Sequence, residues 1–378
     1  MFFCMEGITI FVISSKSIQN NMIIRLHIFV TIIFSIVLYS CKEDPVNIKP
    51  ELFNLDIKGM DISFLPEIEA TNTIFYDSAG VSKDFLDIIK ENGVNTARIR
   101  LWNIEGSAHS GLEEVLQLVA KCRSHGFKIF LDFHYSDTWA DPGAQAIPKN
   151  WIGLNVEQLE DSVYTFTKNI MSKIKPEYVQ IGNEINGGML WDLGKYTNEG
   201  NFVKLLKAGV RGSREASPES KIIIHFAGLE GSDYFFNIMK NASLDYDVIG
   251  LSYYPVWHGK SLALLETTIE RLQKDYNKKV LIAEVSYPFT LQYADYTNNV
   301  LGLESQLVNG YAATKVGQQN FVKEIRSIVE RTKSIGFCYW GGEWIAFKGD
   351  KATDGSSYEN QALFDFQHKA LPAFSAFH

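Results

Sequence analysis

Cysteine is scarce in this chain, with four among 378 residues. None of them has the Cys-x-x-Cys or Cys/His spacing of a zinc site. Cys122 lies late in a helix-like pattern and Cys338 lies inside a strand-like run, so we expect two buried thiols rather than a disulfide. The sequence therefore predicts no zinc centre.

An excess of basic charge is also missing. The formal net charge is −8 and the pI is near 5.6, which excludes nucleic acid as the expected partner because nucleic-acid binders usually carry a basic patch. Hydrophobic residues make up 46% and charged residues 21% of the chain, which excludes wholesale disorder. No internal repeat or low-complexity linker interrupts the body of the sequence, so we expect one folded domain.

The chain has an N-terminal apolar run that is short for a membrane-spanning helix, which takes about 20 residues. Its longest N-terminal run, 28–38, follows Arg25 and precedes Leu38-Tyr39-Ser40-Cys41, the order of a signal peptide ending in a bacterial lipoprotein box. Met22 would give a signal of more usual length. An uncleaved anchor helix is the alternative interpretation.

We therefore expect residues 1–40 to be a signal peptide whose true start is Met22, with Cys41 lipidated and 41–54 forming a polar tether. The residues after Cys41, Lys42-Glu43-Asp44, resemble an acidic signal for surface export. The expected location is the outer membrane, and the cell surface, of a Gram-negative bacterium. Contact with the membrane is expected only through the lipid on Cys41.

From residue 55 onward, apolar runs of strand length alternate with helical patterns. The eight predicted strands are Leu55–Ile62, Thr96–Trp102, Lys128–His134, Tyr178–Glu184, Lys221–Phe226, Asp247–Tyr253, Lys279–Val285 and Ile335–Gly341. The clearest predicted helices are Ser82–Glu91, Leu112–His125, Val156–Ile174, Val203–Ala216, Leu262–Tyr276 and Gln318–Lys333. We predict an α/β fold, a single (β/α)₈ TIM barrel over 55–378 with long loops after strands 3, 7 and 8; a doubly wound sheet is the competing fold.

Two of the predicted strands end on a carboxylate, at Glu184 and Glu284. Glutamate is depleted in strands and costly to bury, so an apolar strand that stops on Glu needs a reason. In a parallel barrel the carboxyl ends of the strands form the active-site face. Two glutamates on that face predict the acid/base and nucleophile of a glycosidase. A buried ion pair with an arginine is the structural alternative for Glu184.

Polar and aromatic residues gather at the same strand ends. Arg98 or Arg100 would keep Glu284 ionised, and His134 or Tyr253 would orient it; a structural histidine and an Asp132–arginine pair are the alternatives. Asn183 would bind a sugar hydroxyl, and Trp340 would lie beneath the sugar ring. The candidate substrate-binding residues are Asp61, Arg100, Trp102, His134, Asp137, Trp139, Asn183, Tyr253, Tyr254 and Trp340. For any single aromatic residue a core position is the alternative, as for Trp102.

Five blocks of this sequence resemble glycoside hydrolase family 53, the arabinogalactan endo-β-1,4-galactanases. They begin at Gly59 (Gly-Met-Asp-Ile-Ser), Arg98 (Arg-Ile-Arg-Leu-Trp-Asn), Asp132 (Asp-Phe-His-Tyr-Ser-Asp-Thr-Trp-Ala-Asp-Pro-Gly), Gln180 (Gln-Ile-Gly-Asn-Glu-Ile-Asn) and Glu359 (Glu-Asn-Gln-Ala-Leu-Phe-Asp). The resemblance covers the whole folded body. It implies a retaining barrel enzyme with Glu184 as acid/base and Glu284 as nucleophile. The implied substrate and partner is β-1,4-galactan of pectic side chains.

The sequence departs from this family at the eighth strand. A block expected to read Tyr-Trp-Glu-Pro-Ala-Trp reads Tyr-Trp-Gly-Gly-Glu-Trp over 339–344, which predicts a reshaped rim of the cleft, and Tyr358 stands where a Trp is expected. No cofactor is required for the chemistry. The resemblance implies a structural calcium in some members, for which the candidate ligands here are Asp295, Asn298, Asn299, Asp350 and Asp354, without an assignment.

Two other functions remain open at this point. Another retaining β-1,4-glycanase, a mannanase or a cellulase, would share the barrel and both glutamates. A non-catalytic, surface glycan-binding lipoprotein would share the cleft but usually loses one catalytic carboxylate. We expect a monomer. No Gly-rich phosphate-binding loop follows the seventh or eighth strand, which argues against a phosphate enzyme.

Overall fold

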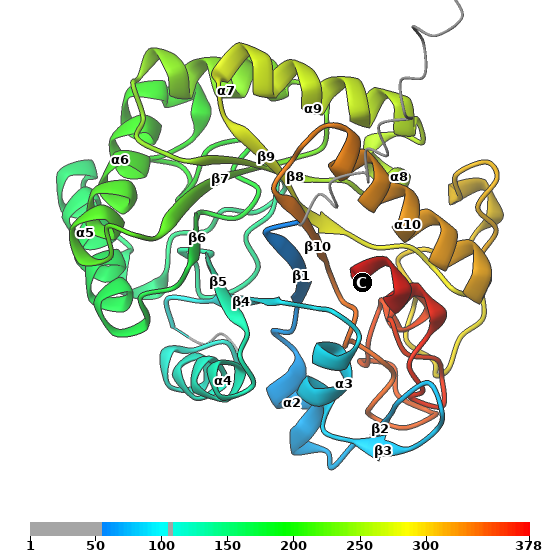
Figure 1. The fold of residues 1–378 in the computed structure, drawn as a ribbon. Coiled ribbons are helices and arrows are strands. Elements are labelled where there is room, and N and C mark those ends of the chain that lie inside the picture. The colour runs from blue at the N-terminus through cyan, green and yellow to red at the C-terminus, as the bar shows by residue number, and fades with distance from the viewer. Residues whose placement is uncertain (1–54, 105–108) are drawn as a thin grey trace, which may run out of the picture. The chain divides into compact units, whose positions relative to one another are not determined.

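Eight strands form one closed barrel. The computed structural model describes residues 55–104 and 109–378, and its sheet is a closed parallel barrel in the order β1-β10-β9-β8-β7-β6-β5-β4 (Figure 1). These strands are β1 (Ile57–Asp61), β4 (Thr96–Leu101), β5 (Lys128–Phe133), β6 (Tyr178–Ile181), β7 (Lys221–Ala227), β8 (Val248–Ser252), β9 (Lys279–Val285) and β10 (Gly336–Tyr339). The first strand pairs with the last, Ile57 opposite Gly336, and so closes the barrel.

Helices surround this barrel and cover its outer surface (Figure 1). They are α2 (Leu65–Ala70), α3 (Phe85–Glu91), α4 (Leu112–Ser124), α5 (Val156–Ile174), α6 (Glu199–Ala216), α7 (Ser232–Asn241), α8 (Pro255–His258), α9 (Leu262–Tyr276) and α10 (Lys315–Arg331). Short 3₁₀ turns are η1 (Lys149–Trp151), η2 (Tyr196–Asn198), η3 (Glu304–Gln306), η4 (Glu359–Gln361) and η5 (Pro372–Phe377). A two-stranded sheet, β2 (Phe75–Tyr76) and β3 (Ser82–Lys83), lies outside the barrel.

Two apolar layers hold the barrel together. The outer layer packs the apolar faces of the helices against the strands, as in α5, whose first turn is fixed by a capping box between Asn155 and Gln158. The inner layer fills the barrel near the amino ends of the strands. It consists of Ile57, Phe130, Tyr178, Ile223, Val248, Leu281 and Ala283. The barrel interior is therefore a packed core, and space for a ligand is left at the carboxyl ends.

The structure confirms the predicted barrel and all eight predicted strands. Two predicted helices, Val156–Ile174 and Leu262–Tyr276, have the bounds that the structure gives α5 and α9. The helix predicted from Ser82 begins instead at Phe85, because Asp84 caps its first turn by accepting from the backbone N–H of Leu86. Helix α7 was not predicted.

Long connections follow β5, β9 and β10. Residues 286–314 join β9 to α10, and the carboxyl-terminal residues follow β10. Tyr339 links both connections, since its hydroxyl hydrogen-bonds the backbone oxygens of Tyr287 and Gln361. These loops are thus fixed to one another at the rim of the barrel.

The predicted signal peptide, Cys41 and the tether up to residue 54 lie outside the described residues. In the described part of the chain, Cys122 and Cys338 are free and buried, which agrees with the expectation of two thiols. No described helix combines the length and apolar character that crossing a membrane takes.

Candidate active site

A cleft of about 630 Å³ opens at the carboxyl ends of the barrel strands. Residues from most strands and from the long loops line it. They are Asp61, Arg98, Arg100, His134, Trp139, Ala140, Asp141, Pro142, Asn183, Glu184, Asn186, Ala227, Tyr254, Trp257, His258, Glu284, Trp340, Trp344, Ser357 and Tyr358.

Glu184 and Glu284 face each other in this cleft. One carboxylate oxygen of each lies within 4.8 Å of the other. Both side chains are almost fully buried, with 8% of Glu184 and 5% of Glu284 exposed. Glu184 has φ of 45°, in the left-handed region that a non-glycine residue adopts only at a cost, and Gly182 just before it has φ of 84°. The chain therefore turns sharply after β6, which brings Glu184 into the cleft.

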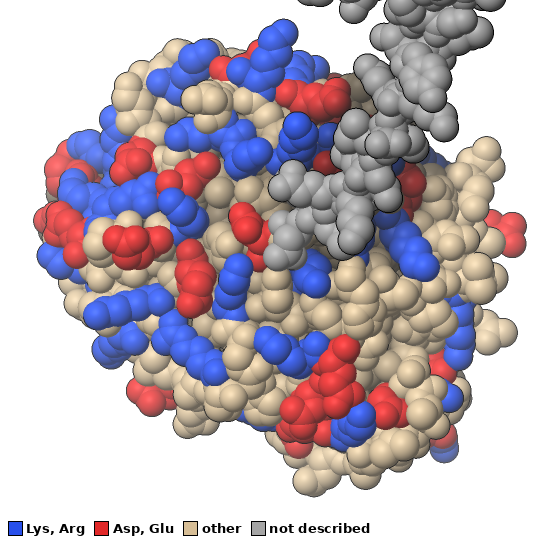
Figure 2. Space-filling model, viewed as in Figure 1, with Lys and Arg blue, Asp and Glu red and all other residues tan. Residues whose placement is uncertain are grey.

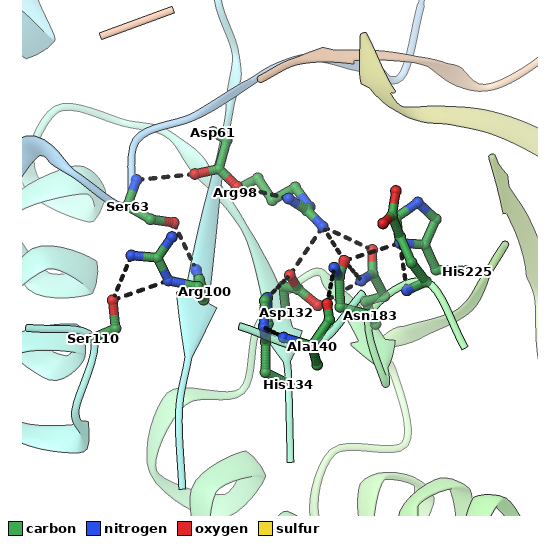
Figure 3. Close-up of polar contacts among 12 residues, drawn as sticks. Asp61, Ser63, Arg98, Arg100, Ser110, Asp132, His134, Ala140, Asn183 and His225 are labelled. Atoms are coloured by element: carbon green, nitrogen blue, oxygen red, sulfur yellow. Dashed lines mark hydrogen bonds and ion pairs between the residues drawn. The ribbon is translucent and has the colours of Figure 1, made fainter. Parts of the chain in front are cut away.

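Arg98 is the centre of a polar network that includes Asp61, Asp132 and Asn183 (Figure 3). Its guanidinium forms ion pairs with Asp61 at 2.7 Å, Asp132 at 2.9 Å and Glu284 at 2.8 Å. It also donates to the side-chain oxygen of Asn183 at 3.0 Å. Because three carboxylates share one cation, this buried cluster carries net negative charge.

Glu284 is held at both of its oxygens. Oε1 pairs with Arg98, and Oε2 accepts a hydrogen bond from the hydroxyl of Tyr254 at 2.8 Å. Burial raises the pKa of Glu284 to about 7, although Arg98 and Tyr254 both lower it. Arg98 therefore lies beside Glu284 and favours its ionised form, as expected of Arg98 or Arg100, while burial opposes ionisation.

Glu184 has no basic partner among the described residues. Its Oε1 accepts a hydrogen bond from the hydroxyl of Ser252 at 2.5 Å, and that hydroxyl also contacts Nε2 of His225 at 2.9 Å. Burial, and then the negative charge of Glu284, raise the pKa of Glu184 well above its ordinary value. The structure therefore gives Glu184 and Glu284 different environments, and it does not support the buried ion pair considered for Glu184.

Aromatic rings form one wall of the cleft. The ring centroids of Trp340 and Tyr358 lie 4.6 Å apart, and Trp344 stacks on Phe64 with ring centroids 3.8 Å apart. Arg100 does not contact Glu284; its guanidinium packs against the ring of Trp139 at 4.2 Å and hydrogen-bonds Ser110. Apolar faces and a few fixed polar groups at a buried cleft suit a flat, hydroxylated ligand.

The altered block after β10 contributes to this wall. A Cβ added at Gly342 would come within 2.4 Å of the Met60 side chain, so the backbone passes close to β1 here. Glu343 is fully buried, and its Oε1 accepts from the backbone N–H of Phe64. Its other oxygen has no hydrogen-bond partner, and burial raises its pKa well above the ordinary value. Glu343 therefore supports Phe64, on which Trp344 stacks.

Most of the predicted site residues line the cleft with the two glutamates. They are Asp61, Arg100, His134, Trp139, Asn183, Tyr254 and Trp340. Three predicted residues do not line it. Tyr253 is fully buried on the other side of the strand and donates to the backbone oxygen of Gly259. Asp137 accepts from the backbone N–H groups of Ile104 and Lys149, and so shapes a loop.

Trp102 is the third predicted residue that does not line the cleft. Its ring is covered by Arg100 at 4.8 Å and by Trp139, so it supports the cleft wall from behind. The orienting contact predicted from His134 or Tyr253 is made by Tyr254 instead. His134 lies in the cleft but hydrogen-bonds Asp132 and the backbone of Ala140.

Several cleft residues were not predicted. Ser252 and His225 act on Glu184, and Trp257, Trp344 and Tyr358 add aromatic surface. A histidine inside the apolar run of β7 was a usable signal for His225, since a strand buried on both faces rarely carries one without a polar partner.

Among the described residues, two groups are compact enough to hold a metal ion. Glu184, His225 and Glu284 form the first, but the guanidinium of Arg98 already supplies the positive charge beside Glu284. Asp84, Asp87 and His125 form the second, on the surface, where Lys121 pairs with Asp84. A cation of the protein itself therefore already contacts each group.

A parallel (β/α)₈ barrel with two unlike, facing carboxyl groups in an aromatic-lined cleft defines the class of the glycoside hydrolases. Comparison with known proteins gives the family. The model of Glycosyl hydrolase family 53 matches residues 57–377, so the chain belongs to that family.

Similar proteins agree with this assignment. The arabinogalactan endo-β-1,4-galactanase of Cellvibrio japonicus is 33% identical, covering 84% of this chain and 89% of its own. The endo-β-1,4-galactanase of Bacillus subtilis is 30% identical, with 87% of each covered. The solved structure of an Ignisphaera aggregans GH53 catalytic domain is 38% identical, with a TM-score of 0.81, covering 85% of this chain and 95% of that one.

Proposed function

We propose that this protein is an endo-acting β-1,4-galactanase that cleaves galactan side chains of pectin with retention of anomeric configuration. The observation that carries the mechanism is the approach of Glu184 and Glu284 oxygens within 4.8 Å. Retaining glycosidases have carboxyl groups about 5–5.5 Å apart, whereas inverting enzymes need about 6.5–9.5 Å to admit a water. Support for the substrate comes from the two galactanase relatives.

In the first step the carboxylate of Glu284 attacks the anomeric carbon while the carboxylic acid of Glu184 protonates the departing oxygen. The glycosidic bond breaks, and an ester joins the sugar to Glu284. In the second step Glu184 takes a proton from water, the water oxygen bonds to the anomeric carbon, and Glu284 leaves. Burial raises the pKa of both carboxyl groups, and Glu184, which lacks the arginine ion pair of Glu284, is better suited to the acid role.

The remaining polar groups would orient the sugar. The side-chain oxygen of Asn183 accepts from Arg98 and Gln180, and its amide donates once to Ala140, which leaves one N–H for a sugar hydroxyl. Gln145 fixes the same turn by donating to the backbone oxygen of Asn183. Trp340 would lie beneath the ring at the cleavage point.

Product analysis on debranched β-1,4-galactan tests this function. We expect a rapid loss of viscosity and release of short galacto-oligosaccharides, with the β-anomer formed first as seen by NMR. Cleavage of mannan or a β-glucan instead of galactan would overturn the substrate but keep the two glutamates. Binding of glycans without any cleavage would overturn the enzymatic function.

The hydroxyl of Tyr254 should set the acid limb of the pH profile. It donates to the ionised form of Glu284, so its removal in Tyr254→Phe disfavours the carboxylate and raises the pKa further. Because the nucleophile must be ionised, we expect the acid limb of kcat/KM to move to higher pH. The alkaline limb, set by Glu184, should stay in place. A profile displaced at both limbs, or at neither, would contradict this role.

We also propose a structural calcium ion between the β9–α10 loop and η4. Support comes from three buried side-chain oxygens without hydrogen-bond partners, one each on Asp295, Asn299 and Glu359. Carboxylate and amide oxygens are the ligands that calcium prefers. Two earlier candidates fit less well: Asp350 is exposed and Asp354 is exposed and paired with Lys348.

When bound, this ion would balance the two buried carboxylates and hold the loop. We expect EDTA to lower Tm by several degrees, and added calcium, but not magnesium, to restore it. Asp295→Asn should remove the response to EDTA. An unchanged Tm in EDTA would show that no such ion is bound.

For the location, we propose an exported lipoprotein anchored through Cys41. Support comes from the order of charged, apolar and small residues before this cysteine. Metabolic labelling with palmitate should mark the wild-type chain and not Cys41→Ser; equal labelling of both would contradict the anchor.

A further inference from the structure

One end of this acidic protein is basic. The whole chain has a formal net charge of −8, yet lysine and arginine side chains spread widely over the face seen in Figure 2, with acidic groups between them. This face lies at the amino ends of the barrel strands, where helices α4, α5 and α9 also finish. Lysine and arginine residues recur along the chain at these helix ends and strand starts.

Six of these cations define what we call the basic face. Each donates to a backbone oxygen in a segment that leads into a strand or ends a helix. The six are Lys90, Arg123, Lys128, Lys240, Lys278 and Lys279, and they bond Gly126, Lys175, Asp56, Asp275, Tyr246 and Lys333 respectively. Within the described part of the chain none of the six forms an ion pair with a carboxylate.

Helix dipoles favour the positions of Lys90, Arg123 and Lys240, in the last turns of α3, α4 and α7, but do not remove their charge. Cations are favoured at the carboxyl ends of helices, where they meet unpaired carbonyls. A carbonyl carries no full charge, however, so each such contact leaves a positive charge at the surface. The nearby acids are partly occupied, since Asp245 and Asp247 pair with Arg214 and Glu177 accepts from the backbone of Ile129.

The basic face and the cleft lie at opposite ends of the barrel, and this is the second observation. Strand β1 begins at Ile57, at this end of the barrel. Glu184 and Glu284 lie at the opposite ends of their strands. A surface bound by the basic face would therefore leave the cleft open on the far side.

We propose that the basic face docks on the phosphate groups of an anionic lipid surface. Lysine and arginine near such a surface gain about 1 kcal/mol each from its negative potential. The interaction adds a second contact to the lipid that we propose on Cys41, and a single acyl chain alone binds membranes only marginally. The proposal goes beyond galactan hydrolysis. It rests on the proposed function only in the point that a docked protein keeps its cleft open to the substrate.

Vesicle binding tests the docking with residues 53–378, which form a compact unit containing the closed barrel and lack the predicted lipid anchor. We expect these residues to sediment with equimolar phosphatidylglycerol and phosphatidylcholine vesicles and to be released by high salt. Neutralising Lys90, Lys240 and Lys279, three exposed members of the basic face, as Lys→Gln, should weaken binding by roughly a hundredfold if each contributes about 1 kcal/mol.

A matched control carries the same changes at Lys149, Lys260 and Lys351, which lie in the connections that follow the carboxyl ends of strands. We expect it to bind as the wild type does, and both variants to keep their Tm and their galactanase activity. Three results would each overturn the proposal. They are equal binding to vesicles of pure phosphatidylcholine, unchanged vesicle binding by the basic-face variant, and binding to polygalacturonate in place of vesicles. Because no galactan is present, this outcome is independent of the proposed enzyme activity.

Discussion

Replacing Glu284 with glutamine should lower kcat on galactan by roughly 10⁴- to 10⁶-fold, the range seen when catalytic residues are removed from a serine hydrolase. An amide cannot attack the anomeric carbon, yet it preserves the shape of the side chain beside Tyr254. We expect the fold to persist, because Arg98 keeps its ion pairs with Asp61 and Asp132. Initial rates and Tm, measured together, separate lost chemistry from lost structure.

Two controls sharpen the Glu284 result. Glu343→Gln changes another fully buried glutamate, and the amide oxygen can still accept from the backbone N–H of Phe64, so kcat should stay close to that of the wild type. Adding azide to Glu284→Ala should give an α-galactosyl azide, since azide attacks from the side that the carboxylate vacates. Retained turnover in Glu284→Gln would contradict the nucleophile assignment.

Replacing Glu184 with alanine should cost about 10²- to 10⁴-fold on galactan, the usual contribution of a general acid or base. The effect should depend on the leaving group. A dinitrophenyl galactoside needs little protonation to depart, so its first step should remain fast and a covalent intermediate should accumulate as a burst. Galactan, whose leaving alcohol needs the proton, should show the full loss.

Azide also distinguishes the acid/base role of Glu184 from the nucleophile role of Glu284. In Glu184→Ala it should intercept the ester on Glu284 and give a β-galactosyl azide, opposite in configuration to the product expected from Glu284→Ala. Ser252→Ala is the companion variant, because it removes the hydrogen bond to Glu184 while keeping the carboxyl group. We expect it to move the alkaline limb of the pH profile upward. A loss for Glu184→Ala that is equal on all leaving groups would contradict the acid role.

Alternation along the strands explains how much of this site the sequence could predict. In β8, Val248 lies in the inner layer and a Cβ at Gly250 would meet His225, so Ser252 and Tyr254 face the same way. That period-two pattern selects Tyr254 rather than Tyr253. The sequence-based list named both tyrosines, and this pattern could have removed Tyr253 from it.

Glu284 marks the limit of such prediction. Leu281 and Ala283 both belong to the inner layer, so strict alternation would turn Glu284 outward. The register between β8 and β9 shifts between Leu251 and Ser252, which places Ser252 opposite Glu284. This irregularity turns the carboxyl group into the cleft. Only the pairing of two strands reveals it, which is why the sequence identified Glu284 but not its contacts.

The closure of the barrel has a consequence for the order of folding. Residues 57–60 of β1 pair with residues 336–339 of β10, near the other end of the chain. During synthesis β1 can find β4 early, but its second edge stays unpaired until nearly the whole polypeptide has emerged. An open strand edge invites association with other chains, and contacts so distant in sequence form slowly. A chain stopped before residue 336 would therefore aggregate rather than form a smaller enzyme, and folding must await release of the complete polypeptide.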